Sequence, residues 1–246
     1  MILSFFDSVK GLEKIHFALA KNNNRSYTLP KRYVLERKTR TQGEQVMDKQ
    51  HFLQYAGRYP VAAAIKSQEE REKALDSEVA LLFLLKGDAF KVADFVQQAH
   101  QRGKGVAVHI DLLSGIGKDR AGVNYLQEIG VDAIITSHSQ LIAAGREAGV
   151  TTIQRLLLLD KATLERGVKT IGRANPDLVE VLPGIIFPEI APQLRKLLPG
   201  PFIGGGFIRT FAEVAHIHQA GALLCSSSTS ALWNTSPINP EKASNW

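Results

Sequence analysis

After Pro60 the chain repeats one unit, a short apolar run followed by a helical stretch, eight times. This alternation is typical of βα units, and right-handed crossovers allow eight parallel strands to close into a barrel. We therefore predict an α/β fold, a TIM-barrel-like (β/α)8 single domain. An open doubly wound sheet is the alternative, although no Gly-x-Gly-x-x-Gly fingerprint follows the first strand. The predicted strands cover residues 61–65, 79–85, 106–112, 131–136, 151–158, 177–182, 202–203 and 222–225.

Two successive strand-to-helix turns near the end of this pattern are suited to binding an anion. Three glycines follow the seventh strand, and because glycine has no Cβ, the backbone N–H groups can approach a ligand closely. Thr210 and Glu213 then form a capping box that begins a helix. Three serines follow the eighth strand, and barrels of this type bind phosphate in these two turns. An ordinary tight turn is the alternative for the glycines. The predicted phosphate-binding residues are Gly204, Gly205, Gly206, Ser226, Ser227 and Ser228.

Polar residues stand near the ends of the third, fifth and sixth strands, where this fold places functional groups. His109 and Asp111 are two residues apart, so their side chains share one face if the strand continues through both. We predict that this face points into the lumen and not towards the helices. We expect His109 to be structural and Asp111 to contact a ligand. Gln154 and Glu180 can hydrogen-bond the hydroxyl groups of a small phosphorylated polyol. For Gln154 and its neighbour Arg155, sealing the barrel rim is an equal alternative.

The net charge of +6 is concentrated near the N-terminus. Residues 1–60 hold 11 Lys and Arg against 5 Asp and Glu, whereas residues 61–246 hold 19 of each kind. A basic arm could bind nucleic acid. We favour an extension, residues 1–46, that is disordered or not natively translated, because Met47 offers a second start just before the regular pattern. The barrel domain then covers residues 47–246, with its core at 60–234.

Composition limits the other classes of protein. A chain of 246 residues with 44% hydrophobic residues can bury a large core. Its one cysteine, Cys225, excludes an intrachain disulfide and a multi-cysteine zinc site, and is expected to be a small buried side chain. The most apolar run, residues 79–85, is too short to cross a bilayer, and no signal-peptide layout begins the chain. We therefore predict a cytoplasmic protein without a membrane partner.

The sequence offers little for catalysis. Lys66 and Lys86 follow strands but lie among capping or loop residues, not in the apolar setting that a Schiff-base lysine needs. Asp111 and Glu180 lack the surrounding carboxylates and histidines of a metal site. We therefore predict no catalytic residue, no metal and no cofactor. An enzyme acting on a small phosphorylated metabolite, such as a lyase, isomerase or phosphodiesterase, is the alternative function.

Five separated motifs fall in an order that resembles a known family. They are residues 109–112 (HIDL), 153–155 (IQR), 158–160 (LLD), 180–184 (EVLPG) and 205–210 (GGFIRT). Together they resemble the glycerol-3-phosphate-responsive antiterminators that control bacterial glycerol operons, over residues 61–233. The resemblance implies a barrel regulator that takes glycerol 3-phosphate as its effector. It also implies that the protein binds leader mRNA and so prevents transcription termination. It implies no catalytic activity.

The resemblance also assigns residues. It implies that the glycine and serine turns hold the phosphate, while Asp111, Gln154 and Glu180 face the glycerol moiety. Phe207 stands where we would expect a smaller aliphatic residue, and we expect it to narrow the pocket. We expect the effector to order both turns and so to favour the RNA-binding conformer.

The RNA contact is predicted from charge alone. Arg166, Lys169 and Arg173 are spaced to share one face of the helix after the fifth strand, which makes them candidates for contacting the phosphate backbone. A solvated helix face is the interpretation that we favour for this row unless mutation shows otherwise. A metabolite-binding protein that regulates through a protein partner is the third function that we consider.

Overall fold

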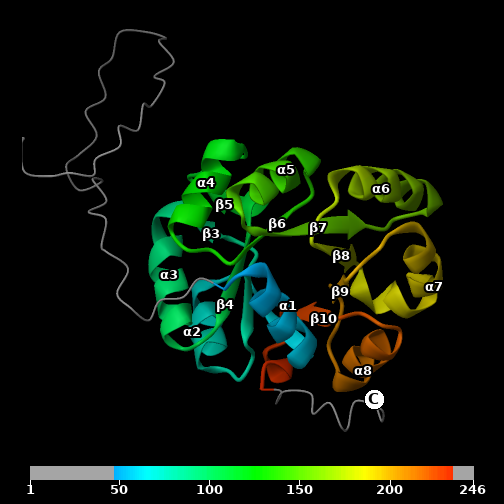
Figure 1. Cartoon of the computed structure of the whole chain (residues 1–246). Coiled ribbons are helices and arrows are strands. Elements are labelled where there is room, and N and C mark those ends of the chain that lie inside the picture. Colours follow the sequence, from blue (N-terminus) through cyan, green and yellow to red (C-terminus); the bar gives the residue numbers. More distant parts are fainter. Residues whose placement is uncertain (1–46, 235–246) are drawn as a thin grey trace, which may run out of the picture. The chain divides into compact units, whose positions relative to one another are not determined.

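The computed structural model describes residues 47–234, in which eight parallel strands form a closed barrel (Figure 1). β10 pairs in parallel with β1, with Val61 opposite Cys225, and this pairing closes the ring. The predicted barrel is confirmed, and the open sheet is excluded. The extension predicted for residues 1–46 lies outside the described residues. In spatial order the strands are β1 (Val61–Ile65), β2 (Leu81–Leu84), β4 (Gly105–His109), β6 (Ala133–Thr136), β7 (Thr151–Leu157), β8 (Leu178–Leu182), β9 (Phe202–Gly205) and β10 (Leu224–Ser227).

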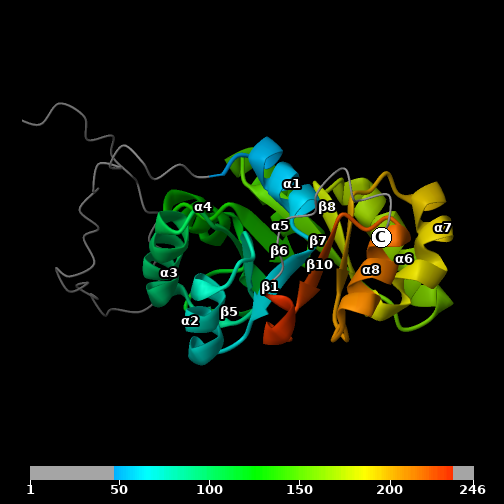
Figure 2. The ribbon, with the colours of Figure 1, turned by 90° about the horizontal axis from the view of Figure 1, so that it is seen from below.

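Helices follow the strands and surround the barrel (Figures 1 and 2). The predicted capping box of Thr210 with Glu213 begins α8, and a second capping box, Ser67 with Glu70, begins α2. None of the helices in residues 47–234 combines the length and apolarity of a membrane-spanning segment. The helices after the first seven strands are α2 (Gln68–Asp76), α3 (Ala89–Gln101), α4 (Arg120–Glu128), α5 (Ser139–Ala148), α6 (Lys161–Ala174), α7 (Phe187–Leu197) and α8 (Phe211–Gln219).

Several loops at the C-terminal ends of the strands carry short structure of their own. We call this end of the barrel the C-terminal mouth. The loops after β2 and β4 pair as a small sheet of two-residue strands, and three other segments form single 3-10 turns. The last of these turns takes the place of an eighth helix. The short elements are β3 (Gly87–Asp88), β5 (Leu113–Ser114), η2 (Ile110–Leu112), η3 (Gly184–Ile186) and η4 (Ser230–Leu232).

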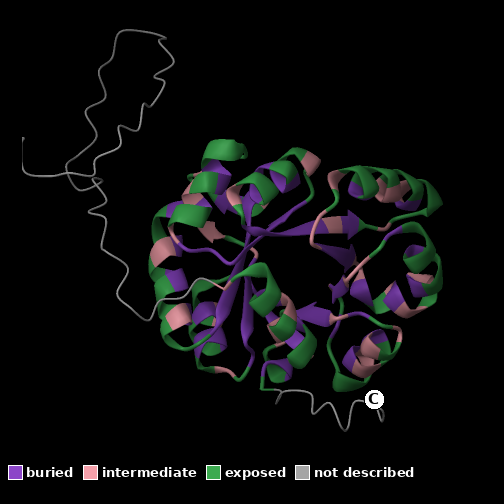
Figure 3. Cartoon of the chain, viewed as in Figure 1, coloured by how far each residue is buried: buried purple, intermediate pink, exposed green. Residues whose placement is uncertain are grey.

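The strands are almost entirely buried (Figure 3). Successive side chains along them alternate between two apolar clusters. One cluster lies between the strands and the helices. The other fills the lumen of the barrel, as is typical of this fold. Cys225 is fully buried in the outer cluster, as predicted. The strand residues of the lumenal cluster are Ala62, Leu81, Phe83, Ala107, Ala133, Ile135, Ile153, Leu178, Ile203 and Leu224.

A helix before the first strand covers the opposite end of the barrel from the mouth. α1 (Lys49–Arg58) buries Phe52 and Ala56 completely against the lumenal cluster. The Met47 N–H donates to Asp132 Oδ1 at 2.6 Å, and Lys49 forms an ion pair with Asp177, so both contacts lie just before strands begin. This helix was not predicted from the sequence. Its ten residues form a structural part of the barrel because their apolar side is buried in the lumen.

Candidate functional site

Four polar side chains project into the lumen near the mouth, and we call them the lumenal polar group. They come from four different strands: His109, Arg155, Glu180 and Ser226. Each follows an apolar lumenal residue by two positions in its strand, so the strand alternation directs it inward. The preceding apolar residues are Ala107, Ile153, Leu178 and Leu224.

Glu180 connects the lumenal polar group. Its Oε1 accepts a hydrogen bond from Ser226 Oγ at 2.6 Å, and its Oε2 lies 2.9 Å from Arg155 Nε. The second contact is an ion pair whose N–H is not aligned for a hydrogen bond, so Arg155 Nε and Glu180 Oε2 each retain hydrogen-bonding capacity. Because Glu180 is only 1% exposed, its charge depends on Arg155 for compensation.

His109 lies at the other side of Arg155. Its Nε2 is 2.7 Å from Arg155 Nη1, and because a guanidinium can only donate, Nε2 must accept. Burial, together with the nearby Arg155 charge, lowers the His109 pKa to about 4. The ring is therefore neutral at pH 7 and carries its hydrogen on Nδ1. This Nδ1–H is buried and has no acceptor among the described residues.

Glycines permit close approach beneath the mouth. A Cβ on Gly205 would lie 2.6 Å from Glu180 Oε1 and 2.8 Å from Ser226 Oγ, so the missing side chain leaves room for this pair. A Cβ on Gly184 would lie 2.4 Å from the backbone nitrogen of Gly205, so η3 packs directly on β9. Gly204 and Gly205 thus lie within β9. Gly206, with φ of +83°, forms the turn that follows.

The turns after β9 and β10 are joined to each other. Ser227 Oγ donates to the carbonyl of Ile208 at 2.7 Å and accepts from the N–H of Thr229 at 3.1 Å. The N–H groups of Phe207 and Ser228 have no hydrogen-bond partner within residues 47–234. Two free backbone donors therefore occur in adjacent turns, each two residues beyond a residue that lies against the Glu180 carboxylate, Gly205 or Ser226.

Lys66 adds a positive charge to this part of the mouth. Its Nζ lies 3.4 Å from Ser228 Oγ, and within residues 47–234 it pairs with no carboxylate. Lys66 follows β1, the strand that closes the barrel against β10, so 162 residues of sequence separate the two partners. From the sequence, Lys66 was weighed only as a Schiff-base lysine and was set aside, so its contact with Ser228 was not predicted. Its position after the first strand, which neighbours the last in a closed barrel, was the available signal.

Asp111 differs from its predicted position. β4 ends at His109, and Asp111 lies in η2, so the prediction that the two residues share a strand face was wrong. The Asp111 carboxylate accepts from Thr136 Oγ1 at 2.6 Å and from the N–H of Ser137 at 2.8 Å. It therefore holds the loop after β6 at the mouth. Its partly exposed carboxylate remains at the mouth, where the predicted ligand contact stays a prediction.

Gln154 and Arg155 point in opposite directions. Ile153 and Arg155 face the lumen, whereas Gln154 donates to Ser139 Oγ, at the start of α5, at 3.1 Å. The structure thus brings Glu180 together with Arg155, and it places Gln154 in the layer between strands and helices. The ligand contact predicted for Gln154 remains untested.

The three basic residues predicted as an RNA contact lie on α6. Arg166, Lys169 and Arg173 are all exposed, at the helical spacing that places them on neighbouring turns. They take no part in the lumenal polar group or the two turns at the mouth. Their predicted role is not tested by these positions.

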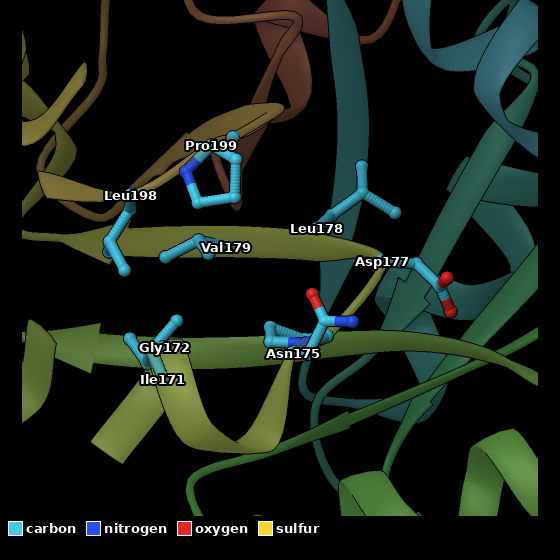
Figure 4. Close-up of a pocket in the computed structure, with 10 residues that line it drawn as sticks. Ile171, Gly172, Asn175, Asp177, Leu178, Val179, Leu198 and Pro199 are labelled. Carbon is cyan, nitrogen blue, oxygen red and sulfur yellow. The ribbon is translucent and has the colours of Figure 1, made fainter. Parts of the chain in front are cut away.

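A small cavity of about 50 Å³ lies at the other end of the barrel (Figure 4). It is bounded by the end of α6 and the segments before β8 and β9, including Asn175, Asp177 and Leu198. None of the predicted site residues lines it. Among residues 47–234, no three His, Cys, Asp or Glu side chains gather in a way that could hold a metal ion.

Comparison with known proteins gives one family match. Residues 61–233 match the family model described as "Glycerol-3-phosphate responsive antiterminator". The Escherichia coli K12 protein YgcP is 27% identical over 175 residues, which cover 71% of this chain and 91% of YgcP.

Two solved structures are similar over the same part of the chain. A glycerol uptake operon antiterminator regulatory protein from Listeria monocytogenes is 31% identical, with a TM-score of 0.67, covering 70% of this chain and 94% of that one. A glycerol uptake operon antiterminator-related protein from Thermotoga maritima is 27% identical, with a TM-score of 0.65, covering 72% and 99%.

Proposed function

This chain belongs to the glycerol-3-phosphate responsive antiterminator family, as its motifs predicted, and on that premise we propose that it is an RNA-binding regulator gated by glycerol 3-phosphate. In this proposal the effector binds at the C-terminal mouth. The effector-bound protein then binds the leader mRNA of glycerol-utilisation operons and prevents transcription termination. It acts as a regulator and carries out no catalysis.

The phosphate group binds at the turns after β9 and β10. The N–H groups of Phe207 and Ser228 are free to donate, the Ser228 hydroxyl is exposed, and the Lys66 ammonium lies beside that hydroxyl. A phosphate dianion needs several donors and a nearby positive charge. Gly206 supports the turn through its positive φ. These two adjacent turns with unused donors, beside an unpaired lysine, are the observation that carries the proposal.

The glycerol moiety binds deeper, against the lumenal polar group. Gly205 contacts the Glu180 carboxylate and is followed directly by the Gly206 turn, so the two parts of the site are contiguous. Each glycerol hydroxyl can donate and accept, and the buried atoms offer both: Glu180 Oε2 accepts, and His109 Nδ1–H donates. A bound hydroxyl would relieve the cost of leaving these groups unpaired, about 1–3 kcal/mol for each.

Calorimetry tests the effector site. We expect glycerol 3-phosphate to bind more tightly than glycerol or inorganic phosphate alone, because only the ester uses both parts of the site. Lys66→Ala should weaken effector binding roughly tenfold through loss of a charged contact. The matched control is Lys196→Ala, which removes an exposed lysine in the last turn of α7. Equal affinity for the ester and for free phosphate would contradict the glycerol subsite.

Filter binding with leader RNA, with and without glycerol 3-phosphate, tests whether the effector controls RNA binding. We expect retention of RNA to rise when the effector is present. The triple change of Arg166, Lys169 and Arg173 to glutamate tests the exposed row on α6. Unchanged RNA retention by this variant would exclude that row as an RNA contact.

Two measurements on the same protein distinguish our proposal from the other two functions, an enzyme and a regulator that acts through a protein partner. Turnover of glycerol 3-phosphate or one of its diesters would favour an enzyme and oppose our proposal. Effector binding without any effector-dependent RNA retention would favour a regulator that acts through a protein partner.

A further inference from the structure

Phe207 is an unusual residue at the edge of the effector site. Its backbone lies in the left-handed region, with φ of +61°, where bulky side chains are rare. Its side chain is 69% exposed, although phenylalanine is usually buried. Gly206 before it also has positive φ, so two consecutive residues direct the ring outward. A strained, exposed aromatic side chain next to a ligand site suggests a function.

Other exposed apolar side chains come from the neighbouring loops. Leu157 and Leu159 stand at the end of β7, and Ile185 lies in the turn after β8. Because β7, β8 and β9 are consecutive in the barrel, these residues and Phe207 belong to three adjacent loops of the mouth. All four side chains are exposed at this end of the barrel.

The basic side chains at the mouth lack carboxylate partners, whereas the acidic ones accept hydrogen bonds. Lys66, Lys86, Lys118 and Arg209 come from loops after β1, β2, β4 and β9, and within residues 47–234 none of them lies within ion-pair distance of a carboxylate. Four acidic side chains that follow the same strands accept hydrogen bonds from backbone N–H groups at the starts of their own helices: Glu70, Asp88, Asp119 and Glu213. Asp111, after β4, accepts instead from Thr136 and Ser137 at the end of β6.

We propose that the C-terminal mouth is the RNA-binding face, with Phe207 as the residue on which an unpaired base stacks. This inference rests on the proposed function. Single-stranded RNA is bound by aromatic faces set among cations that contact the phosphate backbone, and the mouth presents both. The unpaired cations favour RNA over an apolar protein partner, because a protein surface would have to compensate four positive charges.

The same geometry couples the effector to RNA. The N–H of Phe207 is one of the proposed phosphate donors, while the ring of the same residue is the proposed stacking surface. Effector binding therefore stabilises the left-handed turn that presents the ring. By linkage, RNA must raise the affinity for glycerol 3-phosphate by the same factor by which the effector raises the affinity for RNA.

Substitutions at Phe207 test the stacking role. Phe207→Gly keeps the backbone N–H and tolerates the left-handed turn but removes the ring. Because that N–H is a proposed phosphate donor, the effector affinity of the variant is measured first, and its RNA binding is compared with that of the wild type at saturating effector. Its affinity for leader RNA with effector present should fall between about 5-fold and 150-fold. Phe207→Tyr, which retains a stacking ring, should bind RNA as the wild type does. Leu197→Ala, which removes a half-exposed side chain from the end of α7, is the control away from the mouth.

The cations are tested by salt dependence. Replacing Lys86 and Lys118 together with glutamine should reduce the slope of log affinity against log salt concentration by about 1.4, because each single-strand phosphate contact contributes about 0.7. The coupling factor should approach 1 in Phe207→Gly. Wild-type protein that retains no RNA would overturn the proposed function. Wild-type protein that binds RNA while Phe207→Gly and the lysine pair match it would overturn this inference alone, and loss only in the α6 triple variant would place RNA on α6.

Discussion

Replacing Glu180 with glutamine removes one charge from a buried ion pair and keeps the shape of the side chain. The Glu180 side chain is 1% exposed and that of Arg155 is 15% exposed, so the arginine would be left largely buried without a counter-charge. Removing one partner of a buried pair costs about 3–5 kcal/mol. The amide oxygen can still accept from Ser226, so we expect the lower end of this range, about 3 kcal/mol.

Urea unfolding and thermal scans measure this loss. For a domain of this size, about 3 kcal/mol lowers the melting temperature by roughly 6–12 °C. Combining Arg155→Met with Glu180→Gln removes both charges, and we expect the double variant to return to within about 1 kcal/mol of the wild type. Glu147→Gln is the matched control, because Glu147 pairs with Arg120 at the surface, where an ion pair contributes about 0–1 kcal/mol.

Two outcomes would refute this reasoning. Glu180→Gln unfolding within about 0.5 kcal/mol of the wild type would mean that the pair is solvated or dispensable. A double variant that loses the sum of the two single losses would mean that Arg155 and Glu180 do not depend on each other.

Three further predictions concern other parts of the barrel. Phe52→Ala should destabilise the protein by about 3–5 kcal/mol in urea unfolding, because the ring fills the lumen; a loss below about 1 kcal/mol would show that α1 is not needed to close the barrel. The pKa of His109 is lowered from 6.5 to about 4 in the folded protein. Between these two pH values, the imidazole is therefore protonated in the unfolded chain and neutral in the folded one. Stability should therefore fall as pH drops from 6.5 towards 4, by about 3 kcal/mol in all, and His109→Gln should flatten this dependence relative to wild type. Burial raises the pKa of the Cys225 thiol, so a thiol reagent at pH 8 should label the protein only after unfolding; rapid labelling of the native protein would contradict its burial.

Local sequence was enough to predict the barrel. Each strand is a short apolar run, and the helices that follow are marked by their own capping residues, such as Ser67 and Thr210. These signals act over a few residues, and the loop rule for this fold then places the glycine and serine turns at one end of the barrel. The family motifs lie in the same loops and strand ends.

Other features depend on exact register. The sequence shows Gln154 and Arg155 side by side, but one residue of register decides which faces the lumen, and the structure selects Arg155. The direction of the Asp111 side chain likewise depends on where β4 ends, and the strand ends two residues before it.

The sequence by itself determined the eight strands of the barrel, the position of the glycine and serine turns and the family, because each of these is encoded in neighbouring residues. Only the tertiary structure decided that Lys66 stands beside Ser228, that Arg155 balances Glu180 and that α1 closes the far end of the lumen. These contacts join residues far apart in the chain, and they form only when the last strand pairs with the first and the lumen is filled.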